Sequence, residues 1–215
     1  MKRFLKHGLS TVGMFPVVNG IRRLPETVAW VREGCTGPAP PPIKRQTIMA
    51  YLKRHKISAF VETGTYLGDT LAHVAHDQNI SCLSIELDSE LYRAAKKRFR
   101  NRSNVRVLQG DSGELLPGII EELSGPALFW LDGHYSGGIT AKAEVDTPVS
   151  RELQSILDSK IKEHVVLIDD ARCFDGTHGY PFLDELLTTV RRQSKYDVEI
   201  SADIIRLTPG NGHDL

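Results

Sequence analysis

The chain has few cysteines and no long apolar run. Its three cysteines, Cys35, Cys82 and Cys173, are odd in number and far apart, and no CxxC pair is present. This spacing suits a reducing compartment better than a disulfide framework, and it indicates no cysteine zinc site. No apolar run approaches the roughly 20 residues of a membrane-spanning helix, and no signal-type apolar stretch follows the basic start. We therefore expect a cytoplasmic protein without a membrane span.

The chain also lacks an excess of charge of either sign. Lys plus Arg and Asp plus Glu number 27 each among 215 residues, so the formal net charge is zero. A chain without net charge has no overall electrostatic attraction for nucleic acid, so nucleic acid is not an expected partner. The 40% hydrophobic content suits one domain of usual size. The oligomeric state stays open, and a homo-oligomer is one of the options.

A proline-rich stretch divides the chain. Residues 36–42 read TGPAPPP, which is typical of a stiff, polyproline-like linker. We predict an N-terminal extension and linker over 1–42 and a globular domain over 43–215. Within the extension, Pro25 followed by acidic and then apolar residues predicts a short helix over 24–31. A lid, a dimer arm or a packing strap would all produce this pattern.

After the linker, helix and strand patterns alternate, as in a doubly wound α/β sheet. Helices are predicted near residues 44–54, 69–77, 89–101, 113–123, 147–159 and 181–193. Strands are predicted near residues 59–63, 82–86, 105–109, 127–132, 164–169, 196–201 and 203–208. Only a turn separates the last two strands, which is too short for a parallel crossover. We therefore predict a Rossmann-like sheet of about seven strands, mostly parallel, with a C-terminal antiparallel hairpin.

Five of the apolar runs end on acidic side chains. These acids are Glu62, Glu86, Asp111, Asp132 and the pair Asp169-Asp170. In an open α/β sheet, ligands bind outside the carboxyl ends of the strands. An acidic edge at that place predicts a cationic ligand, a hydroxyl-rich ligand or a metal.

The loop after the first strand reads ETGTYLGDT over 62–70. Gly64 and Gly68 allow a tight turn and the close approach of a ligand to the backbone. Tyr66 and Glu62 disfavour a pyrophosphate by their bulk and charge. S-adenosylmethionine suits the loop better, because its amine and sulfonium are positive and its carboxylate can accept N–H bonds beside a helix start. The alternative is that the glycines only shape a strand-to-helix turn.

Two further strand ends extend the cofactor prediction. Glu86 lies 24 residues after Glu62, where an acid can accept both ribose hydroxyls, although it could instead favour the next helix through the helix dipole. Asp111 and Ser112 at the third strand end offer a polar pair for an adenine edge. Capping of the following helix explains either residue equally well.

The fourth and fifth strand ends would bring three more carboxylates together. Asp132 would repel Asp169 and Asp170 and raise their pKa values, whereas a hard divalent cation such as Mg²⁺ relieves the repulsion. The alternative is that Asp169 or Asp170 pairs with Arg172 or a lysine. We favour the metal. His134, in the loop after Asp132, could take a proton near neutral pH, although a lone loop histidine is more often plain surface.

Together, the motifs VETGTYLGDT, SIEL, QGDSGE, WLDGHY and LIDDAR resemble those of class I S-adenosylmethionine-dependent methyltransferases, over roughly Ile43 to Pro209. The first loop is especially similar to that of catechol O-methyltransferase. The resemblance implies that the methionine side of a cofactor pocket is formed by Glu62, Gly64, Tyr66, Gly68 and Thr70. It also implies that Glu86 holds the ribose and Ser112 the adenine.

The predicted metal residues resemble two groups within that family. Catechol O-methyltransferase binds Mg²⁺ with an aspartate and an Asp-Asn pair, which match Asp132, Asp169 and Asp170, except that Asp170 departs from the asparagine. The Asp-Asp form resembles macrocin-type sugar O-methyltransferases, whose catalytic base matches His134. Catechol O-methyltransferase uses a lysine where this chain has Tyr135. The resemblance thus implies Mg²⁺-dependent O-methylation of a small-molecule hydroxyl acceptor, with Asp132 and His134 as catalytic residues and a sugar-containing acceptor favoured.

Two other classes of function stay open. The chain could be a nicotinamide-dependent oxidoreductase with an atypical loop, or a non-catalytic nucleoside-binding protein on the same fold. Binding of NAD(H) rather than S-adenosylmethionine would indicate the first, and bound nucleoside without methyl transfer would indicate the second. Sugar, polyphenol and small metabolite hydroxyls all suit a metal-bridged site.

Overall fold

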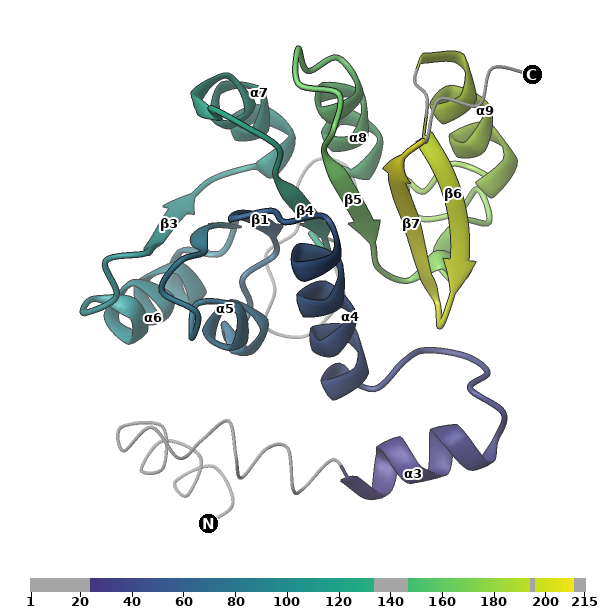
Figure 1. Ribbon diagram of the computed structural model, residues 1–215, viewed down its shortest axis with the longest axis horizontal. Helices are drawn as coiled ribbons and strands as arrows, with labels where there is room; N and C mark the ends of the chain where they lie inside the picture. Colours follow the sequence, from purple (N-terminus) through teal and green to yellow (C-terminus); the bar gives the residue numbers. More distant parts are fainter. Residues whose placement is uncertain (1–23, 134–146, 194–195, 211–215) are drawn as a thin grey trace.

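The computed structural model describes residues 24–133, 147–193 and 196–210, which form one sheet with helices on both faces (Figure 1). The strands are β1 (Ala59–Thr63), β2 (Ser81–Glu86), β3 (Val105–Gln109), β4 (Leu128–Leu131), β5 (Val165–Ile168), β6 (Tyr196–Ser201) and β7 (Ile204–Pro209). The helices are α3 (Leu24–Arg32), α4 (Pro41–Arg54), α5 (Asp69–Val74), α6 (Ser89–Phe99), α7 (Ser112–Glu122), α8 (Val149–Leu157), the short 3₁₀ helix η1 (Ala171–Cys173) and α9 (Leu183–Gln193). None of the helices in these ranges is long and apolar enough to cross a membrane.

The sheet has seven strands in the order β3-β2-β1-β4-β5-β7-β6. The first five are parallel, and β7 runs antiparallel to both β5 and β6. The turn between β6 and β7 consists of Ala202 and Asp203, with φ values of 56° and 63°. Two consecutive positive φ values are what a two-residue hairpin turn of type I′ requires. The predicted fold class, including the C-terminal hairpin, is therefore confirmed.

The predicted strand bounds agree closely with the observed ones, whereas the helix bounds differ by up to three residues, as at α5, which ends at Val74 rather than at 77. Every predicted strand lies within one residue of an observed strand at each end, and the predicted helix over 24–31 is α3. Helix α4 begins at Pro41, three residues before its predicted start at 44, because proline is tolerated in a first turn whose N–H groups lack helical partners. The predicted division between residues 42 and 43 falls in this first turn and stays a prediction.

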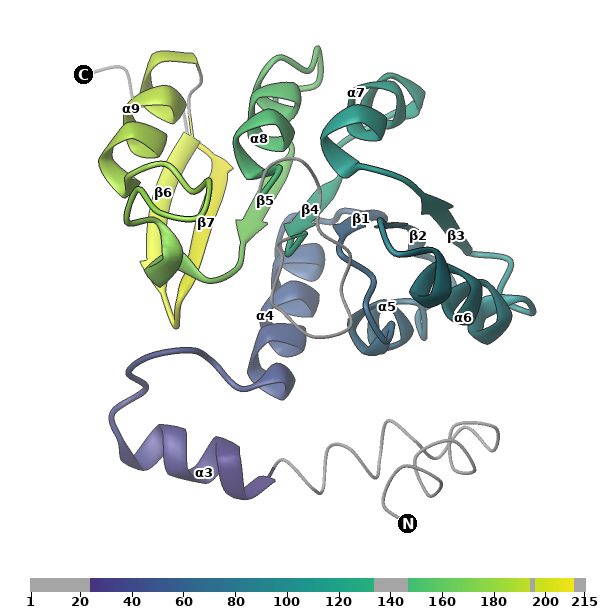
Figure 2. The same ribbon diagram turned by 180° about the vertical axis from the view of Figure 1, so that it is seen from behind.

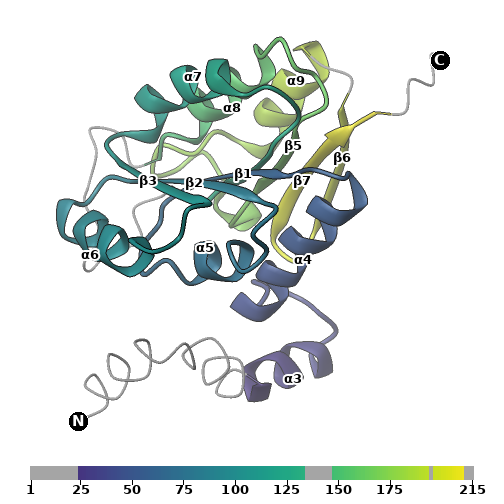
Figure 3. The same ribbon diagram turned by 60° about the vertical axis from the view of Figure 1, so that its left-hand side comes forward.

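Helices cover the two faces of the sheet in groups of three. Helices α4, α5 and α6 lie on one face and α7, α8 and α9 on the other (Figures 2 and 3). Between them, all four residues of β4 are buried: Leu128 and Trp130 pack into the core beneath α4 to α6, and Phe129 and Leu131 into the core beneath α7 to α9. A strand buried on both faces holds the residue that follows it, Asp132, at a fixed place on the sheet edge.

We predict that Phe129→Ala lowers the free energy of unfolding by about 3 to 5 kcal/mol, because the ring is fully buried and its removal leaves a cavity. Urea denaturation measures this change. Phe182→Ala is the matched control, since that ring is 53% exposed and its loss should cost less than about 1 kcal/mol. Equal costs for the two substitutions would contradict the central position of β4.

Candidate functional site

The carboxyl ends of the central strands meet at one edge of the sheet. Leu131 of β4 is in register with Thr63 of β1 and with Ile168 of β5. The pairing continues one residue further, because the Asp132 N–H donates to the Thr63 carbonyl at 3.2 Å and the Asp169 N–H donates to the Leu131 carbonyl at 3.0 Å. The predicted gathering of acids at one edge is therefore observed.

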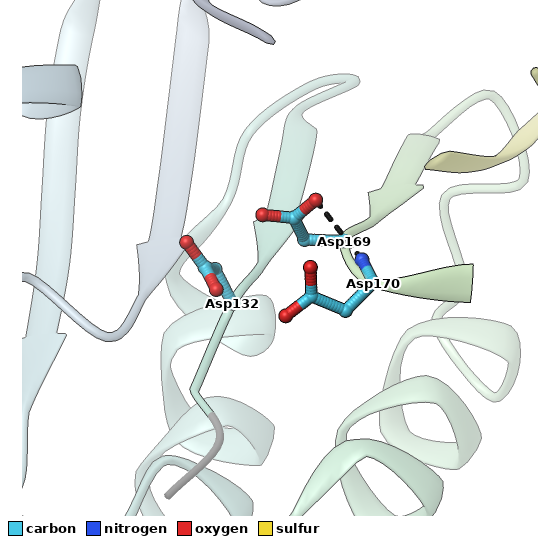
Figure 4. Close-up of side chains that lie close together, drawn as sticks. All are labelled: Asp132, Asp169 and Asp170. Carbon is cyan, nitrogen blue, oxygen red and sulfur yellow. Dashed lines mark hydrogen bonds between the residues drawn. The ribbon is translucent and has the colours of Figure 1, made fainter. Parts of the chain in front are cut away.

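Asp132, Asp169 and Asp170 converge from the ends of β4 and β5 (Figure 4). One carboxylate oxygen of each lies within 4.8 Å of the others. Asp170 has a left-handed φ of 57°, and its N–H donates to Asp169 Oδ1 at 2.9 Å. This bend turns the chain from β5 into η1 and directs both side chains toward Asp132. We call these three residues the aspartate cluster.

Among the described residues, Lys44 and Arg172 contact the aspartate cluster. Lys44 Nζ, from the first turns of α4, lies 2.5 Å from Asp169 Oδ2 and 3.7 Å from Asp170 Oδ1. Arg172 Nη1 lies 2.7 Å from Asp170 Oδ1 and also pairs with Asp203. The ion pairs considered as the alternative to a metal are thus present, and the lysine among them is Lys44.

The charges of the aspartate cluster act on one another. Burial raises the pKa of Asp169, the charge of Asp132 raises it further, and Lys44 lowers it. Burial alone would lower the pKa of Lys44, but Asp169, Asp170 and Asp132 outweigh it, so the pKa of Lys44 lies above its ordinary value. Lys44 is therefore a firmly charged ammonium held among carboxylates.

The aspartate cluster has the donor set of a hard divalent cation. Mg²⁺ takes oxygen ligands at about 2.0–2.1 Å, so oxygens on one ion lie within about 4 Å of one another. The cluster's 4.8 Å spread is slightly wider, and small side-chain rotations would close it. A cation, the ammonium of Lys44, already lies beside Asp169. The residues present therefore fit such an ion.

The glycine loop after β1 packs directly against the end of β4. At Gly64, with φ 81°, an added Cβ would lie 2.4 Å from the Asp132 carbonyl oxygen, and at Gly68, with φ 73°, it would lie 2.9 Å from the Phe99 ring. Tyr66, at the loop tip, has φ 50° and is 48% exposed. Thr70 is half-buried in the first turn of α5. The loop thus joins the predicted cofactor residues to the strand that carries Asp132.

Glu62 lies beneath this loop and is only 1% exposed. Its Oε2 accepts a hydrogen bond from Ser84 Oγ at 2.7 Å, and Ser84 Oγ lies 2.6 Å from Thr65 Oγ1. Burial raises the pKa of Glu62 to about 8; the Ser84 hydrogen bond opposes this rise, while the charges of Asp132 and Glu86 add to it. Glu62 supports the loop from below, and its contact with a cofactor stays a prediction.

Glu86, at the end of β2, is hydrogen-bonded to the backbone of the glycine loop. Its Oε2 accepts from the Tyr66 N–H at 2.7 Å and its Oε1 accepts from the Asp88 N–H at 3.0 Å. Burial raises the pKa of Glu86, while these backbone hydrogen bonds lower it. A carboxylate oxygen accepts more than one hydrogen bond, so the side chain keeps acceptor capacity for hydroxyls.

Asp111 and Ser112 both have structural partners. Asp111 caps α7 by accepting from the Gly113 N–H at 2.8 Å, and it pairs with Arg151 at 3.0 Å. Capping, one of the two explanations considered for these residues, therefore describes Asp111. Ser112 is buried and hydrogen-bonds Glu152. A role for either residue at an adenine edge stays a prediction.

Glu152 of α8 was missed by the sequence reasoning. It is 1% exposed and hydrogen-bonded by Ser112 and Thr63, and burial raises its pKa to about 7. Its Oε1 has no hydrogen-bond partner among the described residues. The residue borders a cavity of about one water's size, shared with Asp132 and Asp169. An acid on the apolar face of α8 was the signal that could have revealed it.

The predicted base is not covered by the structure. His134 and Tyr135 fall in 134–146, outside the described residues. The other predicted site residues are described.

The fold is similar to that of solved methyltransferase structures. The O-methyltransferase TomG from Streptomyces achromogenes, involved in tomaymycin synthesis and in complex with SAM, is 14% identical, with 86% of this chain and 87% of that chain covered and a TM-score of 0.60. An O-methyltransferase from Bacillus cereus in complex with SAH is 12% identical, with 87% of this chain and 90% of that chain covered and a TM-score of 0.59. The SAH-bound Podospora anserina methyltransferase PaMTH1 is 14% identical, with 86% of this chain and 87% of that chain covered and a TM-score of 0.58. By sequence, neither a family model nor a curated protein matches the chain. The chain therefore has the class I methyltransferase fold.

We predict that Gly64→Ala lowers the free energy of unfolding by about 2 kcal/mol, because alanine is strained at positive φ and its Cβ would meet the Asp132 carbonyl. Gly118→Ala is the control, since an added Cβ there meets nothing within 4 Å and alanine favours the helix interior. Chemical denaturation compares the two. A harmless Gly64→Ala would show that the loop does not depend on this contact.

We also predict a pH-dependent stability that originates at Glu62. Its pKa is about 8 when folded and about 4.5 when unfolded, so between these values the folded state keeps a proton that the unfolded state releases. The free energy of unfolding should therefore fall as pH rises, by about 1.4 kcal/mol per pH unit from this group. Glu62→Gln keeps the size of the side chain without titrating, and urea titrations at several pH values should show a shallower slope. Identical slopes would mean that Glu62 is ionised in the folded protein.

Proposed function

We propose that this chain is an S-adenosylmethionine-dependent methyltransferase that performs Mg²⁺-dependent O-methylation of a small hydroxyl acceptor, with a sugar-containing acceptor favoured. The observation that carries the proposal is the contact between Gly64 and the Asp132 carbonyl, because it joins the glycine loop to the aspartate cluster. A methyl donor on the loop and an acceptor at the cluster would then be neighbours.

The cofactor half of the proposal rests on the glycine loop and the acids around it. Glu86 offers a carboxylate to a positively charged nucleoside and has acceptor capacity left for the ribose, while buried Glu62, whose pKa burial raises to about 8, supports the loop. Gly64, Tyr66, Gly68 and Thr70 would surround the methionine part. TomG and the Bacillus cereus enzyme are named as O-methyltransferases and hold SAM or SAH, which supports the same cofactor here.

The acceptor half of the proposal rests on the aspartate cluster. Asp132, Asp169 and Asp170 would hold Mg²⁺, which when bound supplies a positive charge that lowers the pKa of an acceptor hydroxyl. Backbone pairing of Asp132 with Thr63 and of Asp169 with Leu131 fixes the two carboxylates relative to the sheet. His134, two residues after Asp132, would take the hydroxyl proton. Positioning and fixed charge would then supply most of the rate.

We predict that Asp169→Asn lowers Mg²⁺-dependent methyl transfer by about 100-fold while leaving S-adenosylmethionine binding within about threefold of wild type. The reason is that the substitution removes one charge of the aspartate cluster and nothing from the glycine loop. Transfer is measured with radiolabelled S-adenosylmethionine and a panel of sugar-containing and catechol acceptors, and binding is measured by calorimetry.

Asp158→Asn is the control, because Asp158 is exposed at the far end of α8. Equal turnover of Asp169→Asn and wild type would remove the metal from the proposal. Calorimetry that detects NAD(H) but no S-adenosylmethionine would instead favour an oxidoreductase, and cofactor binding without transfer to any acceptor would favour a binding protein.

A further inference from the structure

Lys44 is the basic residue that reaches the aspartate cluster from the other end of the chain. It lies in α4, 125 residues before Asp169, and its side chain is 19% exposed. Helix α4 reads PPIKRQTIMAYLKR and contains no acidic residue, so Lys44 has no carboxylate partner on its own helix. The helix therefore presents this ammonium to the cluster.

The second cation at the cluster is held differently. The Arg172 guanidinium bridges Asp170 and Asp203, and the Arg172 N–H also donates to Asp203 Oδ1 at 2.8 Å. Guanidinium is planar and rigid, whereas the lysine ammonium sits on a flexible four-carbon stem. Arg172 is thus held by two aspartates, one of them outside the cluster, whereas the Lys44 ammonium is on a flexible stem and pairs with Asp169 and Asp170 of the cluster.

A separate observation next to the aspartate cluster, at Glu152, indicates a site for a hydrogen-bond donor such as an ordered water. Glu152 Oε1 is buried without a hydrogen-bond partner in the described part of the chain, and it borders the water-sized cavity shared with Asp132 and Asp169. A buried acceptor without a donor is costly, so it indicates that a donor such as an ordered water belongs in this cavity. A metal ion at the cluster brings ordered waters with it.

We propose that Lys44 is a tethered competitor for the metal position: its ammonium neutralises Asp169 when no metal is bound and must leave Asp169 Oδ2 for a divalent cation to enter. The inference rests on the metal site of the proposed function. Like charges repel, and because Asp169 Oδ1 already accepts the Asp170 N–H, the ammonium occupies the Asp169 oxygen that is left for an ion, Oδ2. Lys44 therefore sets how tightly the site binds metal and keeps the buried acids paired in its absence.

The test is metal binding, measured without turnover. Metal-free wild type, Lys44→Met and Lys44→Arg are titrated with MnCl₂ and MgCl₂ by calorimetry. Lys44→Met should bind Mn²⁺ about tenfold more tightly than wild type, because the competing charge is gone, whereas Lys44→Arg should bind no more tightly. Lys53→Met is the matched control, since Lys53 is an exposed lysine of the same helix and should leave the affinity unchanged.

The outcomes separate this inference from the proposed function. Equal Mn²⁺ affinity of Lys44→Met and wild type overturns the role of Lys44 and leaves the metal site standing. No Mn²⁺ binding by either protein overturns both the inference and the metal site, while S-adenosylmethionine binding still tests the cofactor half.

A second measurement needs no substitution at Lys44. Should Lys44→Met fail to fold, a crystal structure of wild type grown with Mn²⁺ gives the answer. A bound ion with Lys44 Nζ moved beyond hydrogen-bond distance of Asp169 supports the inference. An intact Lys44–Asp169 pair beside a bound ion overturns it.

Discussion

Repulsion among buried carboxylates is the constraint on which the functional edge of this fold depends. Parallel strands bring their carboxyl ends together, and here those ends carry acids. Three of these acids are stabilised in different ways. Burial raises the pKa of Glu62 to about 8, Glu86 accepts hydrogen bonds from two backbone N–H groups, and Asp169 pairs with Lys44. The edge is thus one crowded electrostatic system in which no charge is independent of its neighbours.

The sequence predicted the positions of the strand ends well, because each is an apolar run cut off by an acid. Six acids at the ends of five strands lie at the predicted edge, and the short turn before Ile204 predicted the hairpin. The sequence alone could not predict that Lys44 pairs with Asp169, because the two residues are 125 positions apart and their contact depends on the packing of α4 beside β4. Glu152 was missed for the same reason, since its partners Thr63 and Ser112 come from other elements.

The closeness of the two predicted half-sites follows from packing alone. Gly64 can lie this close to the Asp132 carbonyl only because it has no Cβ, and this close approach places the glycine loop against the end of β4. The acids on either side still influence each other, since Asp132 raises the pKa of Glu62. A positive cofactor bound over the loop and a cation bound at the aspartate cluster would therefore both relieve the same repulsion.

Arg172 explains how the chain accommodates Asp170, the third carboxylate of the aspartate cluster. An aspartate adds one negative charge to an edge already crowded with them, and Arg172 lies 2.7 Å from that carboxylate. Asp203, in the turn between β6 and β7, in turn pairs with Arg172, and its carbonyl accepts from the Ala171 N–H at 2.9 Å, so the C-terminal hairpin is joined to the site. The carboxylate of Asp170 is thus paired by Arg172, and this pairing depends on the antiparallel hairpin that distinguishes this sheet from a wholly parallel one.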